Sequence, residues 1–272
     1  MRTFILSAVI LIGGALCACS PDSSTAPSTT DESAAPAPAA ASVTAASALR
    51  SRVEAALAAA ERPAADKEID ANRKPVEIVE FFGIDSGMTV LDVTAAGGYF
   101  TEVLAAAVGP EGRVYAQNDQ GTLTRADGVM GNALTARLAN NRLPNVQRID
   151  QDVREAGLVD AVDAALVVLT LHDFYNFQGE EVARDVLRAV YTALKPGGVL
   201  GFIDHAGNAG LDNRSLHRLE RSVAERLITE AGFTIETASE VLANSADDHT
   251  VGVFDPSIRR RTDQFVLRAR KP

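Results

Sequence analysis

Residues 88–102, MTVLDVTAAGGYFTE, decide the fold of this chain. Met88–Val93 is an apolar run of the length of one buried strand, and Gly97-Gly98 predicts a tight turn. Residues 99–108 have the composition of a helix, closed by Gly109. A strand that turns at once into a helix is the first half of a strand–helix–strand unit, so a parallel sheet is expected to begin here.

The same alternation continues to the end of the chain. Further strands are predicted at 113–117, 146–149, 162–171, 199–204, 233–237 and 264–268, and further helices at 75–82, 181–194 and 215–231. Strands that are apolar throughout, and separated by helices, are typical of a parallel sheet covered on both faces. The sequence therefore predicts a doubly wound, mostly parallel α/β fold.

The first residues predict export. Phe4–Leu16 is apolar and follows Arg2, as in a signal peptide, and it is shorter than the about 20 residues of a membrane span. Residues 16–19, LCAC, resemble a bacterial lipoprotein signal, which is cut before the cysteine that then carries lipid, here Cys19. The resemblance implies a cell-envelope protein in the periplasm, held at a bacterial membrane only through Cys19. A secretory peptide cut near Ala18 is the alternative.

Three parts follow from composition: a signal peptide at 1–18, a disordered tether at 19–45 and a folded domain at 46–272. Residues 20–42 are mostly Ser, Thr, Ala, Pro and Asp, which bury too little apolar surface to offset the entropy of ordering. The two cysteines are Cys17, within the signal peptide, and Cys19, whose thiol would carry the lipid, so no free thiol is expected in the mature chain. A net charge of −10 argues against a nucleic-acid partner.

Three motifs, in order, resemble the class I S-adenosylmethionine (SAM) methyltransferases. Residues 90–98, VLDVTAAGG, resemble the family's first motif, an acid followed by alternating glycines. Residues 194–200, LKPGGVL, resemble its turn into the fifth strand, and residues 231–233 its usual ending. The resemblance covers about residues 76–266. It implies the Rossmann-like methyltransferase fold, with seven strands of which the last is antiparallel, and SAM as cofactor.

The resemblance also implies where SAM binds. Thr94 and Ala96 stand where the family has glycine, so each adds a Cβ beside the cofactor. Asn118 or Asp119 would hold the ribose, and Asp152 would either meet the adenine amine or cap a helix. The predicted cofactor-binding residues are Asp92, Thr94, Ala96, Gly97, Gly98, Tyr99, Asn118 and Asp152. A nicotinamide dinucleotide is disfavoured because no G-x-G-x-x-G pattern occurs.

Two acid–histidine pairs end neighbouring strands of the expected sheet. His172-Asp173 follows the fourth strand and Asp204-His205 the fifth, and ligands of open α/β sheets bind beyond these strand ends. We predict His172, Asp173 and His205 as catalytic residues. His172 would act as general base toward the accepting O or N, and Asp173 would orient it or bind substrate. A divalent-ion site made by these four side chains, or plain turn capping, are the alternatives.

The sequence thus predicts a SAM-dependent methyltransferase that acts on an O or N of a small molecule. The alternative is a methyltransferase-like envelope protein without cofactor that binds a ligand, because Thr94 and Ala96 would fill the cofactor pocket. A charged stretch from Arg62 to Lys74 is expected to be a solvated helix face, although in the resembled fold an N-terminal helix can cover the cofactor.

Overall fold

The computed structural model describes residues 38–272, and side chains from residue 46 onward. The predicted signal peptide, Cys19 and residues 19–37 of the predicted tether lie outside the described residues. Helix α1 (Pro38–Ala58) begins inside the predicted tether, because proline suits the first turn of a helix, where its missing amide is not needed. In the part of the chain that the structure describes, no helix is long and apolar enough to cross a membrane.

One twisted sheet organises the fold, with strand order β3-β2-β1-β4-β5-β8-β7. Its strands are β1 (Thr89–Val93), β2 (Arg113–Gln117), β3 (Val146–Ile149), β4 (Val162–Val168), β5 (Leu194–Gly207), β6 (Leu219–Glu220), β7 (Thr234–Ser239) and β8 (Gln264–Arg270). Strands β1 to β5 are parallel, whereas β8 runs antiparallel to both β5 and β7. The predicted doubly wound sheet with an antiparallel last strand is confirmed, and the two-residue β6, which pairs with β5, is an addition.

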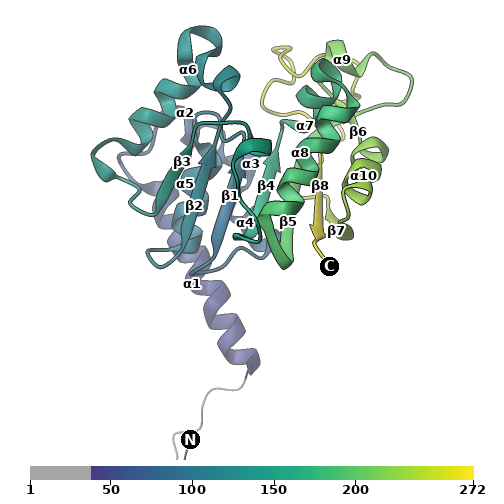
Figure 1. The fold of residues 1–272 in the computed structure, drawn as a ribbon. Coiled ribbons are helices and arrows are strands. Elements are labelled where there is room, and N and C mark those ends of the chain that lie inside the picture. Colours follow the sequence, from purple (N-terminus) through teal and green to yellow (C-terminus); the bar gives the residue numbers. More distant parts are fainter. Residues whose placement is uncertain (1–37) are drawn as a thin grey trace, which may run out of the picture. The chain divides into compact units, whose positions relative to one another are not determined.

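Helices cover both faces of this sheet (Figure 1). They are α2 (Ala64–Lys67), α3 (Asp70–Arg73), α4 (Pro75–Phe82), α5 (Tyr99–Val108), α6 (Gln120–Leu138), α7 (Leu171–Asp173), α8 (Glu180–Ala193), α9 (Asn213–Leu216) and α10 (Arg221–Glu230), with the short turns η1 (Ala139–Asn141), η2 (Val153–Glu155) and η3 (Phe174–Gln178). Alternate strand residues feed two cores: Leu91 packs with α8 and α10, and Val90 packs with α1, α4 and α5.

The structure differs from the prediction at two places that matter for the site. Strand β4 ends at Val168, because Leu169 takes a left-handed φ of 54° and residues 171–173 form α7. The predicted helix 215–231 is instead α9, β6 and α10, because His217 also takes a left-handed φ of 54° and ends α9. Both departures lie at the carboxyl ends of the strands.

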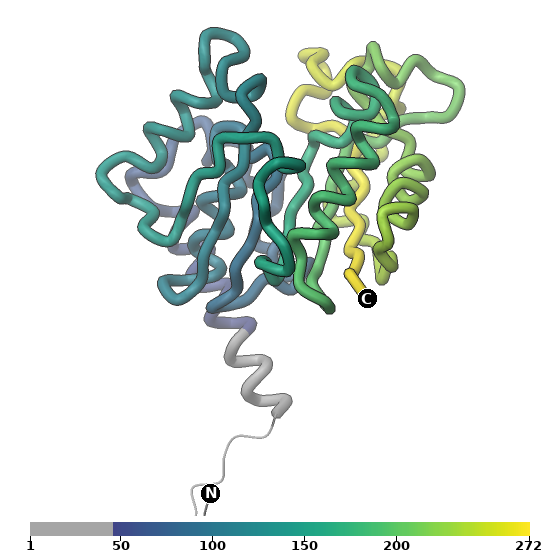
Figure 2. Tube along the Cα trace, viewed as in Figure 1, coloured from purple at the N-terminus to yellow at the C-terminus, as the bar shows by residue number. Residues whose placement is uncertain are grey.

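A buried ion pair holds the loops that follow β5 and β7. The side chains of Arg218 and Asp247 are both fully buried, and Nη2 of Arg218 donates to the two carboxylate oxygens at 2.9 and 3.0 Å. Arg218 also donates to the carbonyls of Ala206 and Val251. The pair thereby joins residues 206–218 to residues 247–251, which lie together above the strand ends (Figure 2).

Loss of this pair should destabilise the protein far more than loss of a surface pair. Arg218→Met leaves the Asp247 carboxylate buried without its cation, so the free energy of unfolding should fall by about 3–5 kcal/mol. The control Arg221→Met, which breaks an exposed pair with Glu225, should cost less than about 1 kcal/mol. Denaturant unfolding measures both, and equal small losses would contradict the assignment.

Candidate functional site

The loop from β1 to α5 keeps the backbone shape of a glycine-rich turn. Thr94 and Ala96 take left-handed φ values of 53° and 50°, and Gly98 one of 83°. Residues other than glycine pay roughly 1–2 kcal/mol for this conformation. At the two positions where the family has glycine, Thr94 and Ala96 therefore adopt the backbone conformation typical of glycine, although each has a side chain.

Side chains from the end of β2 hold this loop in place. Gln117 accepts from the Thr94 amide at 3.0 Å, and Asn118 accepts from the Ala96 amide at 2.8 Å while donating to the Ala96 carbonyl at 3.2 Å. Asn118 is fully buried. Its side-chain amide is therefore engaged by the loop, which leaves Asp119 as the other residue predicted for a ribose contact.

The two remaining acids of the predicted cofactor edge cap helical turns. Asp119 begins α6 and accepts from the Thr122 amide at 2.6 Å. Asp152 begins η2, accepts from the Arg154 amide at 2.9 Å and pairs with its guanidinium. The hydrogen bonds from Arg154 lower the pKa of Asp152. Asp152 thus takes the capping role that the sequence left open.

The charged stretch before α4 is not the solvated helix face that was expected. Arg62 is buried and pairs with Asp70, which also accepts from the Tyr99 hydroxyl at 2.6 Å. A second network joins Asp66 to Arg137 at 2.6 Å, and Arg137 in turn to Glu102 and to the carbonyl of Gly97. These pairs pack residues 62–73 against the β1–α5 loop.

Arg73 also lies beside the β1–α5 loop, where it packs on aromatic rings. Its guanidinium lies 4.4 Å from the centre of the Tyr99 ring and 5.8 Å from that of Phe100. Burial lowers the pKa of Arg73, with Tyr99 and the carboxylates of Asp66 and Asp92 acting against this effect. Within residues 46–272 the guanidinium has no hydrogen-bond or ion-pair partner. Arg73 could therefore pair with an anionic group of a ligand.

Asp92, the acid of the first motif, is buried at the end of β1. It accepts from Thr101 Oγ1 at 2.6 Å, which links β1 to α5. Burial raises the pKa of Asp92 to about 6, although the hydrogen bond from Thr101 and the charges of Arg73 and Arg137 oppose that rise.

The two acid–histidine pairs meet as the sequence predicted. The rings of His172 and His205 have centres 5.4 Å apart. The fully buried Asp204 carboxylate joins the two residues: it accepts from the His172 and His205 amides at 2.9 and 2.8 Å and bonds His172 Nδ1 at 2.6 Å. Asp173 Oδ1 lies 3.3 Å from His172 Nε2 on the other side of the ring.

This environment alters the two imidazoles in opposite directions. Burial alone lowers the pKa of His172, but the charges and hydrogen bonds of Asp204 and Asp173 outweigh burial and raise it to about 10. Burial lowers the pKa of His205 to about 3; Asp204 opposes this change, whereas His172 adds to it. The two carboxylates therefore favour the protonated form of His172, whereas the general-base role predicted for it needs the neutral form.

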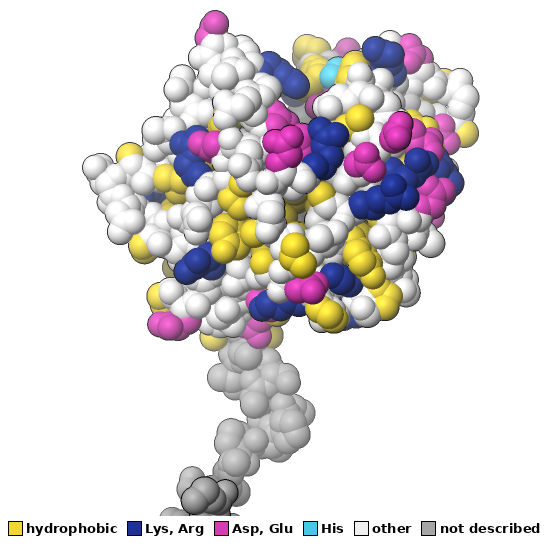
Figure 3. All heavy atoms as spheres, viewed as in Figure 1, with side chains coloured by type: hydrophobic (Ala, Val, Ile, Leu, Met, Phe, Trp, Pro, Cys, Tyr) yellow, Lys and Arg dark blue, Asp and Glu magenta, His cyan; other side chains and the backbone are white. Residues whose placement is uncertain are grey.

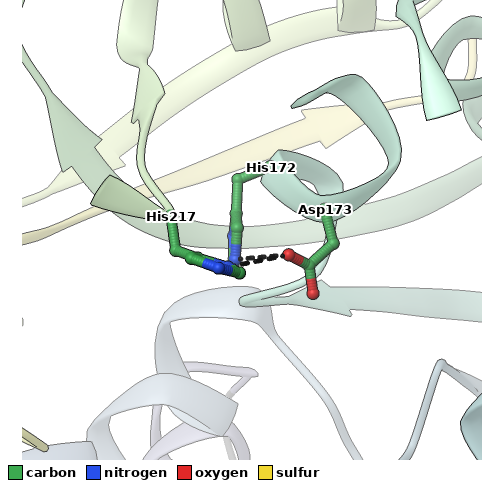
Figure 4. Close-up of side chains that lie close together, drawn as sticks. All are labelled: His172, Asp173 and His217. Atoms are coloured by element: carbon green, nitrogen blue, oxygen red, sulfur yellow. Dashed lines mark hydrogen bonds and ion pairs between the residues drawn. The ribbon is translucent and has the colours of Figure 1, made fainter. Parts of the chain in front are cut away.

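His217 is the residue of this cluster that the sequence analysis missed. Its Nδ1 lies 3.2 Å from Asp173 Oδ1, and its ring centre lies 6.0 Å from that of His172 (Figure 4). It was assigned to a continuous helix at 215–231. Asp212-Asn213, a helix-start signal directly after the Gly207–Gly210 turn, was the sequence sign of a separate short helix.

Comparison with known proteins gives a fold and no sequence relative. No protein-family model matches the chain, and no curated protein matches its sequence. A SAM-dependent methyltransferase from Aquifex aeolicus is 21% identical with a TM-score of 0.54, over 73% of this chain and 89% of that one. A putative O-methyltransferase from Nostoc punctiforme is 18% identical with a TM-score of 0.52, over 81% of this chain and 60% of that one.

The fold is that of the class I methyltransferases. At these identities the likeness concerns the methyltransferase fold alone. The same fold occurs in the [4+2]-cyclase SpnF, which is 19% identical with a TM-score of 0.53, over 74% of this chain and 80% of that one. Since one fold serves different reactions, the activity has to be argued from the site.

The raised pKa of Asp92 predicts a pH dependence of stability. Between about pH 4 and pH 6 the folded state retains a proton that the unfolded state releases, so rising pH costs stability. Relative to Asp92→Asn, the wild type should lose about 2–3 kcal/mol of unfolding free energy over this window and then level off. Chemical denaturation of both proteins at several pH values measures this difference. A constant difference would contradict the raised pKa.

Proposed function

We propose that this chain is a SAM-dependent methyltransferase that transfers a methyl group to an O or N of a small molecule. The observation that carries the proposal is the β1–α5 loop, which keeps left-handed backbone at Thr94, Ala96 and Gly98 where the methyltransferase fold receives its cofactor. The structural neighbours that are SAM-dependent enzymes support it. When bound, SAM supplies a methyl group already activated on a sulfonium.

Three parts of the chain would hold the cofactor. The backbone of residues 94–98 and the start of α5 would face the methionine portion. Arg73, which lacks an acceptor within residues 46–272, would pair with the methionine carboxylate. Asp119 would hold the ribose hydroxyls, because Asn118 is engaged by the loop.

The acceptor would lie on the side of the histidines. Strands β1 and β4 are neighbours in the sheet, so the loop after β1 and the His172-Asp173 turn after β4 lie at the same edge. Asp204 and His205 lie near the end of the next strand, β5. His172, Asp173 and His205 would orient a polar acceptor toward the methyl group, with the buried Asp204 holding His172, and orientation of this kind is a large part of catalysis of a two-substrate reaction.

The surface is consistent with a small-molecule acceptor rather than a nucleic acid. On the face drawn in Figure 3, positive and negative side chains are interspersed, and a histidine reaches the upper rim beside hydrophobic side chains. The net charge of −10 also opposes binding to a phosphate backbone.

Calorimetric titration of the purified protein with SAM and S-adenosylhomocysteine tests the proposal. We expect binding of both, and Arg73→Met should weaken it by about tenfold or more, because a charge-assisted hydrogen bond is lost. Arg259→Met removes an exposed charge of the same kind and should leave affinity unchanged. Failure of the folded protein to bind either compound would end the methyltransferase proposal and favour the ligand-binding alternative.

We also propose that the protein is exported and held at a bacterial membrane by a lipid on Cys19. The support is the sequence LCAC at residues 16–19 after an apolar run. Metabolic labelling with a fatty-acid probe in a bacterial host should mark the wild type and Cys17→Ser but not Cys19→Ser. Equal labelling of the two variants would contradict the assignment of Cys19.

A further inference from the structure

Two histidines and a carboxylate converge at the carboxyl edge of the sheet. His172 and Asp173 lie on α7, and His217 ends α9, 44 residues after Asp173. Each offers one ligand atom, and the three atoms lie within 4.8 Å of one another. Figure 4 shows both imidazoles directed at the same oxygen of Asp173. We propose that His172, Asp173 and His217 form a binding site for a divalent transition metal, with Zn²⁺ as the best-suited ion.

Two of the three ligand separations match a tetrahedral coordination sphere, and the third lies within 4.8 Å. His172 Nε2 and His217 Nδ1 lie 3.3 and 3.2 Å from Asp173 Oδ1. Metal–ligand bonds of about 2.0–2.1 Å in tetrahedral geometry place neighbouring ligand atoms about 3.3 Å apart. Two imidazoles and one carboxylate also form a ligand set that binds first-row transition metals in preference to Mg²⁺ or Ca²⁺.

Asp204 completes the arrangement from behind His172. Metal-bound histidines almost always donate their second ring N–H to a carboxylate or carbonyl, which fixes the ring and the tautomer. Asp204 Oδ1 lies 2.6 Å from His172 Nδ1 and so leaves Nε2 for the metal. Because Asp204 is fully buried and also accepts from two backbone amides, its carboxylate cannot turn away from the ring.

His217 is held in position by its surroundings. Its left-handed φ of 54° turns the chain at the end of α9, and the next residue, Arg218, is locked into its buried pair with Asp247. The His217 ring packs on those of Phe177 and Phe254, whose centres are 4.9 and 5.0 Å away. These contacts keep Nδ1 directed at Asp173.

The site is open enough to load and to keep a free coordination position. The side chain of His172 is 4% exposed, whereas those of Asp173 and His217 are 37% and 30% exposed. Three protein ligands with access to solvent are the pattern of zinc sites that bind water or a ligand in the fourth position. A bound cation would take the place of the His172 proton, which leaves to solvent.

This site differs from the ion site considered from sequence. Asp204 supports His172 instead of facing the ion, and His205 Nδ1 bonds Thr262 Oγ1 at 2.7 Å. His217 supplies a third ligand, and this residue was not part of the ion site considered from sequence. The proposal concerns metal binding alone and does not depend on methyl transfer.

Metal titration of the full chain, purified without a histidine tag and stripped with a chelator, tests the site. Calorimetry with Zn²⁺ and the visible absorption of bound Co²⁺ should both show one ion per chain, and Co²⁺ should show a tetrahedral spectrum. Asp173→Asn and His217→Ala should each weaken binding by more than about 100-fold. Asp204→Asn should weaken it by about 10–100-fold through His172.

His249→Ala is the matched control. His249 is also a partly buried histidine paired with an acid, Asp263, but it lies outside the three-ligand cluster. Its loss should leave Zn²⁺ affinity unchanged. If no stoichiometric ion binds, or if Asp173→Asn and His217→Ala bind Zn²⁺ as tightly as the wild type, the contacts are ion pairs around a protonated His172 and the metal site is overturned. No SAM is present in these titrations, so their failure is separate from failure of the methyltransferase proposal.

Discussion

The carboxylate of Asp204 is the constraint on which the functional edge depends. It is fully buried at the end of β5, and it bonds two backbone amides and one imidazole from the ends of β4 and β5. A buried carboxylate without such partners would be very costly, so this geometry is strongly imposed. It fixes His172 and His205 relative to each other, and through His172 it fixes where Asp173 and His217 can meet.

A second set of buried contacts supports the β1–α5 loop in the same way. Gln117 and Asn118 bond the backbone of the β1–α5 loop, so Thr94 and Ala96 stay in a conformation that neither favours. Arg137 reaches from α6 to the carbonyl of Gly97. The strain of the loop is thus offset by hydrogen bonds from neighbouring elements. The histidine cluster and the β1–α5 loop are therefore alike: in each, buried polar groups from neighbouring elements hold the local geometry.

The sequence predicted well those helices and strands whose bounds are set by the local pattern of residues. The bounds of α5, β2 and β3 agree with the structure, because apolar strands and glycine stops act over a few residues. The approach of His172-Asp173 to Asp204-His205 was also predicted, since neighbouring parallel strands end at one edge. The helix expected at 215–231 was right only from residue 221, where α10 begins; the residues before it differ because Arg218 is drawn into the interior by Asp247, 29 residues later. The charged stretch 62–74 was misjudged for the same reason: Asp66 has its partner in α6.

The sequence by itself therefore determined the succession of strands and helices along the chain, the doubly wound class and the strand ends at which polar side chains gather. These follow from hydrophobic periodicity and from the rules of parallel sheets, which need no knowledge of distant partners. Only the tertiary structure decided that Asn118 bonds the loop, that Asp204 supports His172, and that His217 joins Asp173. Each of these depends on which buried polar group finds which partner across tens of residues, and the pattern along the chain carries no record of that choice.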